Sequence, residues 1–171
     1  MTKELLAPVA ALTLICLVVS AALAVTNSAT APVIAAAART RAEAAQKEVL
    51  PEADTFETVR NESLPESVTE AYAAANGAGY VFMLTARGGY GGDIGIIVGI
   101  DGAGVISAVK TLSHSETEGI GASAIPKLET GLAGSVSPEE VQAVSGATVT
   151  SKAFLGAIDD AFKAYGILKG A

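Results

Sequence analysis

The sequence contains very few of the side chains from which proteins build metal centres and disulfides. It has one cysteine, Cys16, one histidine, His114, and no tryptophan. A disulfide within the chain is therefore excluded, and we expect no metal site built from cysteine or histidine, because such sites need several of these ligands. Any redox chemistry would have to come from an organic cofactor or from a partner protein.

Positive charge is also scarce. The chain has 11 Lys and Arg residues against 18 Asp and Glu residues, which gives a formal net charge of −7. The basic residues are scattered, and no two of them are adjacent. The sequence thus lacks the basic patch that attracts polyanions, and we expect no nucleic-acid partner.

A long uncharged run is the most prominent feature that the sequence does have. As a helix, residues 5–25 would extend about 31 Å at roughly 1.5 Å per residue, close to the hydrocarbon thickness of a bilayer. We predict a transmembrane helix over 5–25, in contact with membrane lipid. The alternative is a cleaved signal peptide, but the apolar run is longer than a usual signal core and continues to Arg39.

The charges beside this run predict its orientation. The α-amino group and Lys3 lie before it, whereas the other flank has no charge until Arg39. The positive-inside rule places residues 1–4 in the cytoplasm and the remainder of the chain on the extracytoplasmic side of the membrane.

A helical stalk is expected over residues 26–53. The alanine-rich stretch 35–49 has high helix propensity, and Pro51 would end it. The folded domain is then expected to occupy residues 54–171.

The first half of that domain has the pattern of an antiparallel sheet. Segments 80–86, 93–100 and 105–112 are rich in β-branched and apolar residues and are separated by glycine-containing turns, so we predict three strands. Segment 68–76 is interpreted as a short helix or turn.

The second half is expected to mix irregular structure with one good helix. Residues 123–137 contain a proline and two glycines and are expected to be irregular. Ser137 is expected to cap a helical turn, with Glu140 completing a capping box, and 141–144 to form a short strand. Apolar spacing over 152–167 predicts a helix. The fold class is therefore α+β: a membrane helix and stalk, then a small antiparallel sheet with flanking helices.

The segment 145–151, Ser-Gly-Ala-Thr-Val-Thr-Ser, has a composition suited to phosphate binding. Its small residues let the backbone approach a ligand, and its four hydroxyls offer hydrogen bonds. It precedes the predicted helix, whose N-terminus favours anions. It lacks the Gly-Lys-Ser/Thr ending of a nucleotide-hydrolysing P-loop. The alternative interpretation is a plain helix cap with solvated neighbours.

Three segments, in order, resemble the FMN-binding domain family. The segment 145–151 resembles its flavinylation motif, 91–101 resembles its glycine-rich hairpin, and 114–121 resembles a loop that lines the flavin pocket. In that family the threonine that ends the Ser-Gly-Ala-Thr string is esterified by the phosphate of FMN. The resemblance therefore implies covalently bound FMN on Thr148.

The same resemblance implies a set of residues around the ester. Those from 145 to 151 would hold the phosphate, while those from 114 to 121 would contact the flavin or let the loop pack against it. The alternative for the second group is that they are ordinary loop residues. No catalytic or metal-binding residue is implied. The expected cofactor-binding residues are Thr148, Ser145, Gly146, Ala147, Thr150, Ser151, Glu116, Thr117, Gly119 and Gly121.

Within the family the chain is most similar to G subunits of Rnf complexes, the ion-translocating ferredoxin:NAD oxidoreductases of bacterial cytoplasmic membranes. This implies an electron-carrier subunit that works with other membrane subunits, including one with a second flavin, and that is matured by a flavin transferase. The complex would couple electron transfer between ferredoxin and NAD to the export of Na⁺ or H⁺.

Two other functions fit the same residues. One is an extracytoplasmic flavoprotein of another chain, either similar to the C subunit of sodium-pumping NADH:quinone reductase or serving extracellular electron transfer. The other is an anchored structural domain in which 145–151 only caps a helix. The sequence also departs from the family at Gln142, where Asp commonly begins the flavinylation motif.

Overall fold

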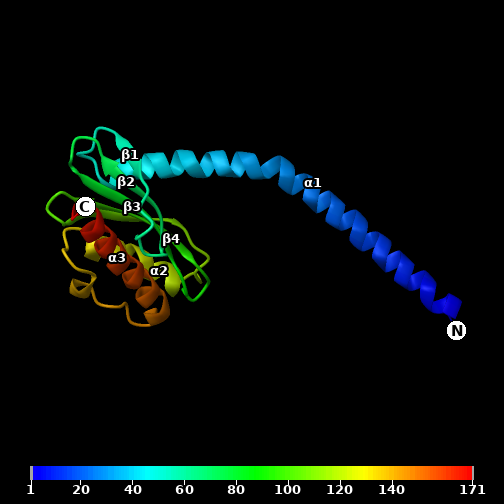
Figure 1. Cartoon of the computed structure of the whole chain (residues 1–171). Helices are drawn as coiled ribbons and strands as arrows, with labels where there is room; N and C mark the ends of the chain where they lie inside the picture. The colour runs from blue at the N-terminus through cyan, green and yellow to red at the C-terminus, as the bar shows by residue number, and fades with distance from the viewer. Residues whose placement is uncertain (1, 171) are drawn as a thin grey trace. The chain divides into compact units, whose positions relative to one another are not determined.

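Two compact units make up the chain, Met1–Thr40 and Arg41–Ala171 (Figure 1). The computed structural model describes residues 2–170, with side chains from residue 8 onward. The first unit consists of helix alone, and the second contains the sheet and the remaining helices.

Helix α1 runs without a break over Thr2–Val49 and contains Pro8 and Pro32. The helix predicted over 5–25 is confirmed as helix, and the helical stalk predicted over 26–53 is helical up to Val49. The stretch Pro8–Val49 is long and apolar enough to cross a membrane, with a mean hydropathy of 2.5 in its most apolar window, none of which is buried. These are properties of a membrane-crossing helix and also of a signal sequence.

Two threonine hydroxyls along the apolar part of α1 are hydrogen-bonded within the helix itself. Thr13 donates to the carbonyl of Val9, and Thr26 donates to the carbonyl of Ala22, each at 2.9 Å. Such bonds remove the penalty for placing a hydroxyl in an apolar medium, so these residues are compatible with a lipid environment.

The second unit is built on an antiparallel meander of five strands in the order β1-β2-β3-β4-β5. The three strands predicted from the sequence are confirmed, with boundaries shifted by one residue at most ends. The strands are β1 (Phe56–Val59), β2 (Val68–Ala74), β3 (Gly79–Ala86), β4 (Ile94–Asp101) and β5 (Ile106–Ser113).

The short helix or turn expected over 68–76 is wrong, because this segment forms β2. Its register is set by β3, with Ala71 opposite Phe82 and Tyr72 opposite Val81. Three alanines in Val68–Ala74 gave the segment little β character on its own. Pairing with a strongly apolar neighbouring strand overrides that weak local preference.

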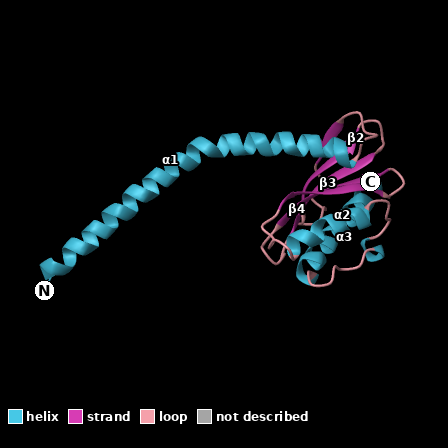
Figure 2. Ribbon diagram, turned by 180° about the vertical axis from the view of Figure 1, so that it is seen from behind, coloured by secondary structure: helices cyan, strands magenta, loops and turns pink. Residues whose placement is uncertain are grey.

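Two helices, α2 (Gly121–Leu132) and α3 (Thr148–Lys169), lie on the same face of the sheet (Figure 2). Their buried residues form one core with alternate residues of the central strands. Phe82 and Ile96 on the strands, with Leu128 and Phe154 on the helices, are all 0 % exposed. This core holds the beginning of α3 against the sheet, which matters for the site described below.

The opposite face of the sheet is covered by the end of α1 and the residues that follow it. Ala45, Val49, Leu50 and Ala53 pack with Val81, Ile97 and their neighbours in a second core. A Cβ at Gly99 would collide with the carbonyl of Val49, so only glycine permits this close approach. The compact domain thus begins at Arg41, within the segment expected to be a stalk.

Two smaller expectations for the second half of the domain are wrong. Residues 123–137 are not irregular, because most of them belong to α2, with Pro126 inside it. Residues 124, 125, 128 and 132 are buried at helical spacing, and their burial outweighs the local signals of proline and glycine. The segment 141–144 forms no strand.

The turn of helix predicted at Ser137 exists as the 3₁₀ helix Pro138–Glu140, but its cap differs from a capping box. The Ser137 hydroxyl accepts a hydrogen bond from the Glu139 N–H at 3.2 Å. A capping box would require the Glu140 carboxylate to accept a hydrogen bond from the N–H of Ser137. Instead it accepts one from the N–H of Val136, at 3.4 Å.

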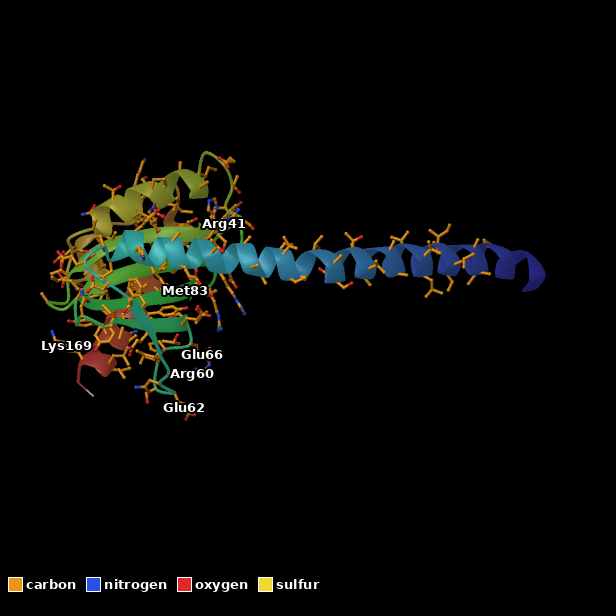
Figure 3. All side chains as sticks on the ribbon, turned by 90° about the horizontal axis from the view of Figure 1, so that it is seen from above. Arg41, Arg60, Glu62, Glu66, Met83 and Lys169 are labelled. Carbon is orange, nitrogen blue, oxygen red and sulfur yellow. The ribbon has the colours of Figure 1, made fainter. Side chains whose placement is uncertain are left out.

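Charged residues lie near the ends of several elements of the domain. Arg60, Glu62 and Glu66 project from the connection between β1 and β2 (Figure 3). At the other end of the domain, the Lys169 ammonium donates to the carbonyl of Gly102 at 3.0 Å and to the Tyr165 hydroxyl at 2.9 Å. These bonds fasten the last turn of α3 to the turn after β4.

Candidate functional site

Helix α3 begins at Thr148, four residues before the predicted helix over 152–167. The residues Thr148–Ser151, predicted as loop, therefore form its first turn. The residue before it, Ala147, has no side chain that can cap the helix, and no described side chain does so. Gly146 has a φ of +83°, a conformation that glycine adopts without strain. The chain thus turns sharply and presents an uncapped helix N-terminus, where N–H groups and the helix dipole favour an anion.

The hydroxyls of this first turn differ in their exposure. Thr148 is exposed, whereas Thr150 is 1 % exposed and Ser151 is 0 % exposed. The Ser151 hydroxyl donates to the carbonyl of Ala147 at 2.9 Å and accepts from the N–H of Val144 at 3.0 Å. Ser151 therefore holds the turn in shape, and the exposed hydroxyl is that of Thr148.

Glu116 joins three segments that are far apart in the sequence. One carboxylate oxygen accepts from the Thr150 hydroxyl at 2.7 Å, and the other accepts from the N–H of Gly91 at 3.1 Å. The side chain is buried, and its own backbone N–H donates to Nδ1 of His114 at 3.3 Å. The carboxylate thus ties the β3–β4 connection and the loop after β5 to the start of α3.

The glycines around Glu116 allow these segments to approach one another. A Cβ at Gly121 would collide with the Glu116 carboxylate, and one at Gly89 would approach its other oxygen. A Cβ at Gly91 would collide with the carbonyl of Ser115. Glycine is needed at each position because the neighbouring atoms occupy the space of a side chain.

A hollow of about 310 Å³ lies beside the start of α3. It is lined by residues of the β3–β4 connection, of the loop before α2 and of the first turn of α3. The lining residues are Tyr90, Ile120, Gly146, Ala147, Thr148, Val149 and Thr150.

The rim of this hollow is unusually apolar for an exposed surface. Within residues 41–170, the large hydrophobic side chains that are exposed are Tyr90, Ile120, Val136 and Val149. All of these except Val136 line the hollow. Tyr90, the most exposed, is 71 % accessible. Single exposed apolar residues are common on protein surfaces and need no explanation. Several of them around one hollow indicate a binding surface.

The structure brings together some of the sequence-predicted residues and not others. Gly146, Ala147, Thr148 and Thr150 line the hollow, whereas Ser151, Glu116 and Gly121 are buried behind it. Ser145, Thr117 and Gly119 are exposed and do not line it.

Sequence reasoning missed the three apolar residues of the rim. Tyr90 stands between two glycine pairs, and Ile120 is the one large apolar residue in a polar, glycine-containing loop. A bulky apolar residue in a turn of small and polar residues was the available signal.

Comparison with known proteins gives this arrangement a context. The G subunit of the Na⁺-translocating ferredoxin:NAD⁺ oxidoreductase complex of Acetobacterium woodii is 31 % identical over 86 % of this chain and 85 % of its own. The model of the FMN-binding domain family matches residues 89–163. This chain belongs to the FMN-binding domain family.

Shorter similarities agree with this assignment. The G subunit of the ion-translocating oxidoreductase complex of Haemophilus influenzae is 41 % identical over 46 residues, which is 27 % of this chain and 22 % of that protein. The corresponding protein of Shewanella piezotolerans is 45 % identical over 51 residues, 29 % of this chain and 24 % of its own. The segment matched by the FMN-binding domain family contains every residue that lines the hollow.

The residues at the hollow fit FMN. Its phosphate suits the uncapped N-terminus of α3, where the Thr148 hydroxyl is exposed. Its isoalloxazine ring suits the apolar rim, and a volume of about 310 Å³ is at the lower end of pockets that hold small molecules, which range over roughly 300–1,000 Å³.

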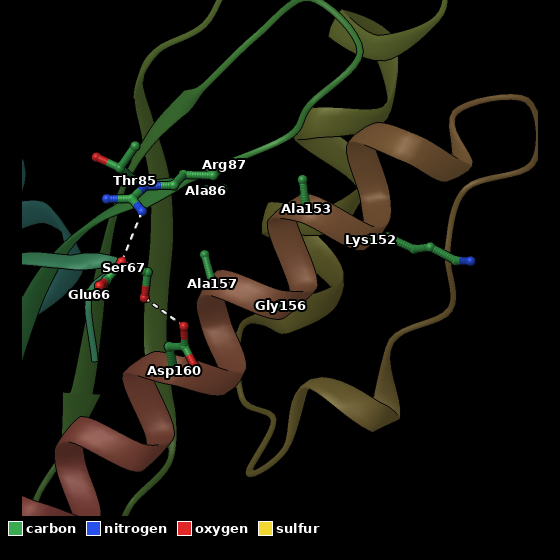
Figure 4. A pocket seen from close by; sticks show the side chains of 10 residues that line it. All are labelled: Glu66, Ser67, Thr85, Ala86, Arg87, Lys152, Ala153, Gly156, Ala157 and Asp160. Carbon is green, nitrogen blue, oxygen red and sulfur yellow. Dashed lines mark hydrogen bonds and ion pairs between the residues drawn. The ribbon is translucent and has the colours of Figure 1, made fainter. Parts of the chain in front are cut away.

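A second hollow, of about 380 Å³, lies farther along α3 but has the contacts of a structural junction (Figure 4). The Ser67 hydroxyl donates to the Asp160 carboxylate at 2.7 Å, and Arg87 pairs with Glu66 at 3.0 Å. Burial alone would raise the pKa of Asp160, but hydrogen bonds from Lys163 and Ser67 outweigh it and lower that pKa. The Lys152 side chain points away from these pairs. The Ser67–Asp160 bond therefore fastens α3 to the start of β2, and the Arg87–Glu66 pair joins the residues that flank β3 and β2.

Proposed function

We propose that this protein is an electron-carrying subunit of an ion-translocating membrane oxidoreductase, and that it holds FMN through a phosphoester on Thr148. The observation that carries the proposal is the exposed Thr148 hydroxyl, at the uncapped start of a helix and beside an apolar hollow. The chain's similarity to the G subunit of such a complex, over 86 % of its length, supports the assignment to this kind of enzyme.

The first turn of α3 supports the phosphate end of the cofactor. Its free N–H groups and the positive end of the helix dipole stabilise a phosphate in this position. Glu116 and Ser151 act indirectly, because their bonds to Thr150 and to the backbone of 144 and 147 fix the turn that carries Thr148. They are positioning residues and are not expected to touch the phosphate.

Bound FMN would supply reversible electron transfer, chemistry for which ordinary side chains are unsuited. The protein contributes the attachment point and the apolar surroundings, and no residue is assigned to bond making or breaking on a substrate. Because an ester at Thr148 holds the cofactor at one end only, the domain works as a tethered carrier between neighbouring redox centres.

In this proposal α1 crosses the bacterial cytoplasmic membrane once, with the N-terminus inside and the domain on the extracytoplasmic side. Lys3 and the α-amino group precede the apolar run, in accordance with the positive-inside rule. The partners are membrane lipid, the other subunits of the complex, including one with a second flavin, and the flavin transferase that forms the ester. The complex exchanges electrons between ferredoxin and NAD and exports Na⁺ or H⁺.

The experiment that tests this proposal is an intact-mass measurement on protein purified from its native membrane and then denatured. We expect a mass increase equal to FMN less one water, located on Thr148 by peptide mapping. Thr148→Ala should have the unmodified mass, whereas Thr130→Ala removes an exposed hydroxyl of α2 that lies outside both the hollow and segment 145–151, so it should keep the adduct. An unmodified wild-type protein would contradict the proposal and favour an anchored structural domain.

A further inference from the structure

We propose that Tyr90 is the residue against which the isoalloxazine ring of the FMN stacks. This inference rests on the proposed function, because it takes the cofactor to be attached at Thr148. It goes beyond that function by naming the side chain that contacts the isoalloxazine ring and shields it from solvent. Tyr90 lines the same hollow as Thr148 and is 71 % exposed.

The backbone on both sides of Tyr90 is held in place. The N–H of Gly91 donates to the Glu116 carboxylate at 3.1 Å, and the neighbouring atoms of Glu116 and Ser115 leave no room for a side chain at Gly89 or Gly91. Tyr90 therefore stands on a connection fixed to the body of the domain, while its own ring is turned to solvent. A fixed aromatic side chain loses little conformational freedom when a ligand packs on it.

An exposed tyrosine at this position needs an explanation, because burial of an aromatic ring is favourable. Ile120 and Val149 are also exposed at the rim, and each of the three comes from a different segment. Three separate segments thus place apolar side chains around the Thr148 hydroxyl. This arrangement suits a flat, largely apolar group. A flavin ring attached at Thr148 has this character.

The tether makes a single aromatic contact sufficient. A ring that is covalently attached nearby meets Tyr90 at a high effective concentration, so stacking need not supply the whole binding energy. Aromatic side chains stack on planar heterocycles without requiring a particular hydrogen-bonding pattern. Tyr90 would therefore hold the ring against the domain while the cofactor is at rest, and release it when a partner approaches.

Stacking on a phenol has a spectroscopic consequence. Tyr90 would quench the fluorescence of the flavin by giving one electron to the excited ring and taking it back, so that neither group is oxidised overall. Replacing Tyr90 by Ala should raise the fluorescence per bound flavin several-fold and make the ring more accessible to iodide. Tyr90→Phe keeps an aromatic face without the hydroxyl, so it should remain protected from iodide while losing part of the quenching.

Val136→Ala is the matched control, because Val136 is an exposed apolar residue that does not line the hollow. We expect its fluorescence and its accessibility to iodide to equal those of the wild type. All four proteins are compared as full-length chains, with the signal divided by the covalently bound flavin measured from the intact mass. If Tyr90→Ala and Val136→Ala both behave as the wild type, the inference is wrong.

A second measurement needs no variant and covers the case in which Tyr90→Ala accepts no flavin. Complete proteolysis of the wild-type protein leaves the flavin on a short peptide without Tyr90, and its fluorescence should rise several-fold. Unchanged fluorescence would overturn the inference. Failure of the proposed function is distinguishable from this result, because then the wild-type protein would carry no flavin at all.

Discussion

Glu116 shows how one buried side chain can hold the separate segments of a site together. Its two carboxylate oxygens accept hydrogen bonds from Thr150 and from the N–H of Gly91, and the side chain is buried. A buried carboxylate is unfavourable unless its oxygens are hydrogen-bonded, and here both are. The expectation that Glu116 bonds to the flavin stays a prediction, whereas its structural contacts are directly visible.

Replacing Glu116 by Ala should lower the free energy of unfolding by about 1–3 kcal/mol, because the buried Thr150 hydroxyl would lose its acceptor. Chemical denaturation of the purified protein measures this change. Glu118→Ala serves as the control, since Glu118 is exposed, and its effect should stay within about 0.5 kcal/mol. Equal effects of the two substitutions would show that the carboxylate does not hold the three segments together.

Asp160 makes a pH-dependent contribution. Hydrogen bonds from Lys163 and Ser67 outweigh the opposite effect of burial and lower its pKa in the folded state. A carboxyl with a lowered folded pKa stabilises the protein above its unfolded pKa of about 3.9, and this contribution is lost as the pH falls through the folded value.

Asp160→Asn should therefore be less stable than the wild type at pH 7, and the difference should shrink as the pH falls below about 4. Thermal unfolding across this pH range tests the expectation. Asp159→Asn is the comparison, because Asp159 also pairs with Lys163 but its side chain is 54 % exposed. A difference between wild type and Asp160→Asn that is independent of pH would refute the assignment.

At the scale of the elements, α1 has two roles, because its last turns belong to the core of the second unit. Val49 and Leu50 are 0 % and 1 % exposed and cover the face of the sheet opposite α2 and α3. The end of a helix that begins in an apolar run is thus an integral layer of the soluble fold. The predicted boundary between the stalk and the domain, after residue 53, stays untested. The second core nevertheless includes residues before this boundary, from Ala45 to Ala53.

A fragment that begins at Asp54 should consequently be far less stable than one that begins at Arg41. Removal of residues 41–53 uncovers Val81 and Ile97, which are 0 % exposed, and deletes the side chains that cover them. Each buried aliphatic side chain contributes about 1.5–3 kcal/mol, which is large against a total stability of roughly 5–15 kcal/mol. Solubility and circular dichroism of the two fragments provide the test; equal stability would mean that these residues are only a spacer.

The elements also show where prediction from sequence succeeds. The strands β3, β4 and β5 were foreseen because their β-branched and apolar residues carry a local signal. Strand β2 and helix α2 were missed because alanines, Pro126 and Gly131 give misleading local signals. Their conformations depend on pairing with β3 and on burial against the sheet, which are long-range interactions that a single sequence does not display.

The candidate site divides in the same way. The motif at 145–148 identified Thr148 because a short string of small residues and hydroxyls is readable in one place. Tyr90, Ile120 and Val149 escaped notice because their importance lies in being exposed together around one hollow. Exposure is a property of the folded domain, and apolar residues in a sequence are expected to be inside it.

For the molecule as a whole, the scarcity of cysteine makes its orientation testable. Cys16 lies in the apolar part of α1, and the chain has no other cysteine. In a Cys16→Ser background, Glu118→Cys should react with a membrane-impermeant thiol reagent in intact cells, whereas Thr2→Cys, which keeps Lys3, should react only after permeabilisation. The opposite pattern would place the domain in the cytoplasm.

The exposure of Thr148 bears finally on the order in which the protein is made. Its hydroxyl lies at the surface of a domain whose core, and whose Thr150–Glu116 hydrogen bond, are made by the chain's own residues. If the ester forms there, the chain can be translocated and folded first and modified afterwards. Flavin supply would then limit how many subunits are active, and not how many are folded, so cells starved of flavin should accumulate the intact but unmodified protein.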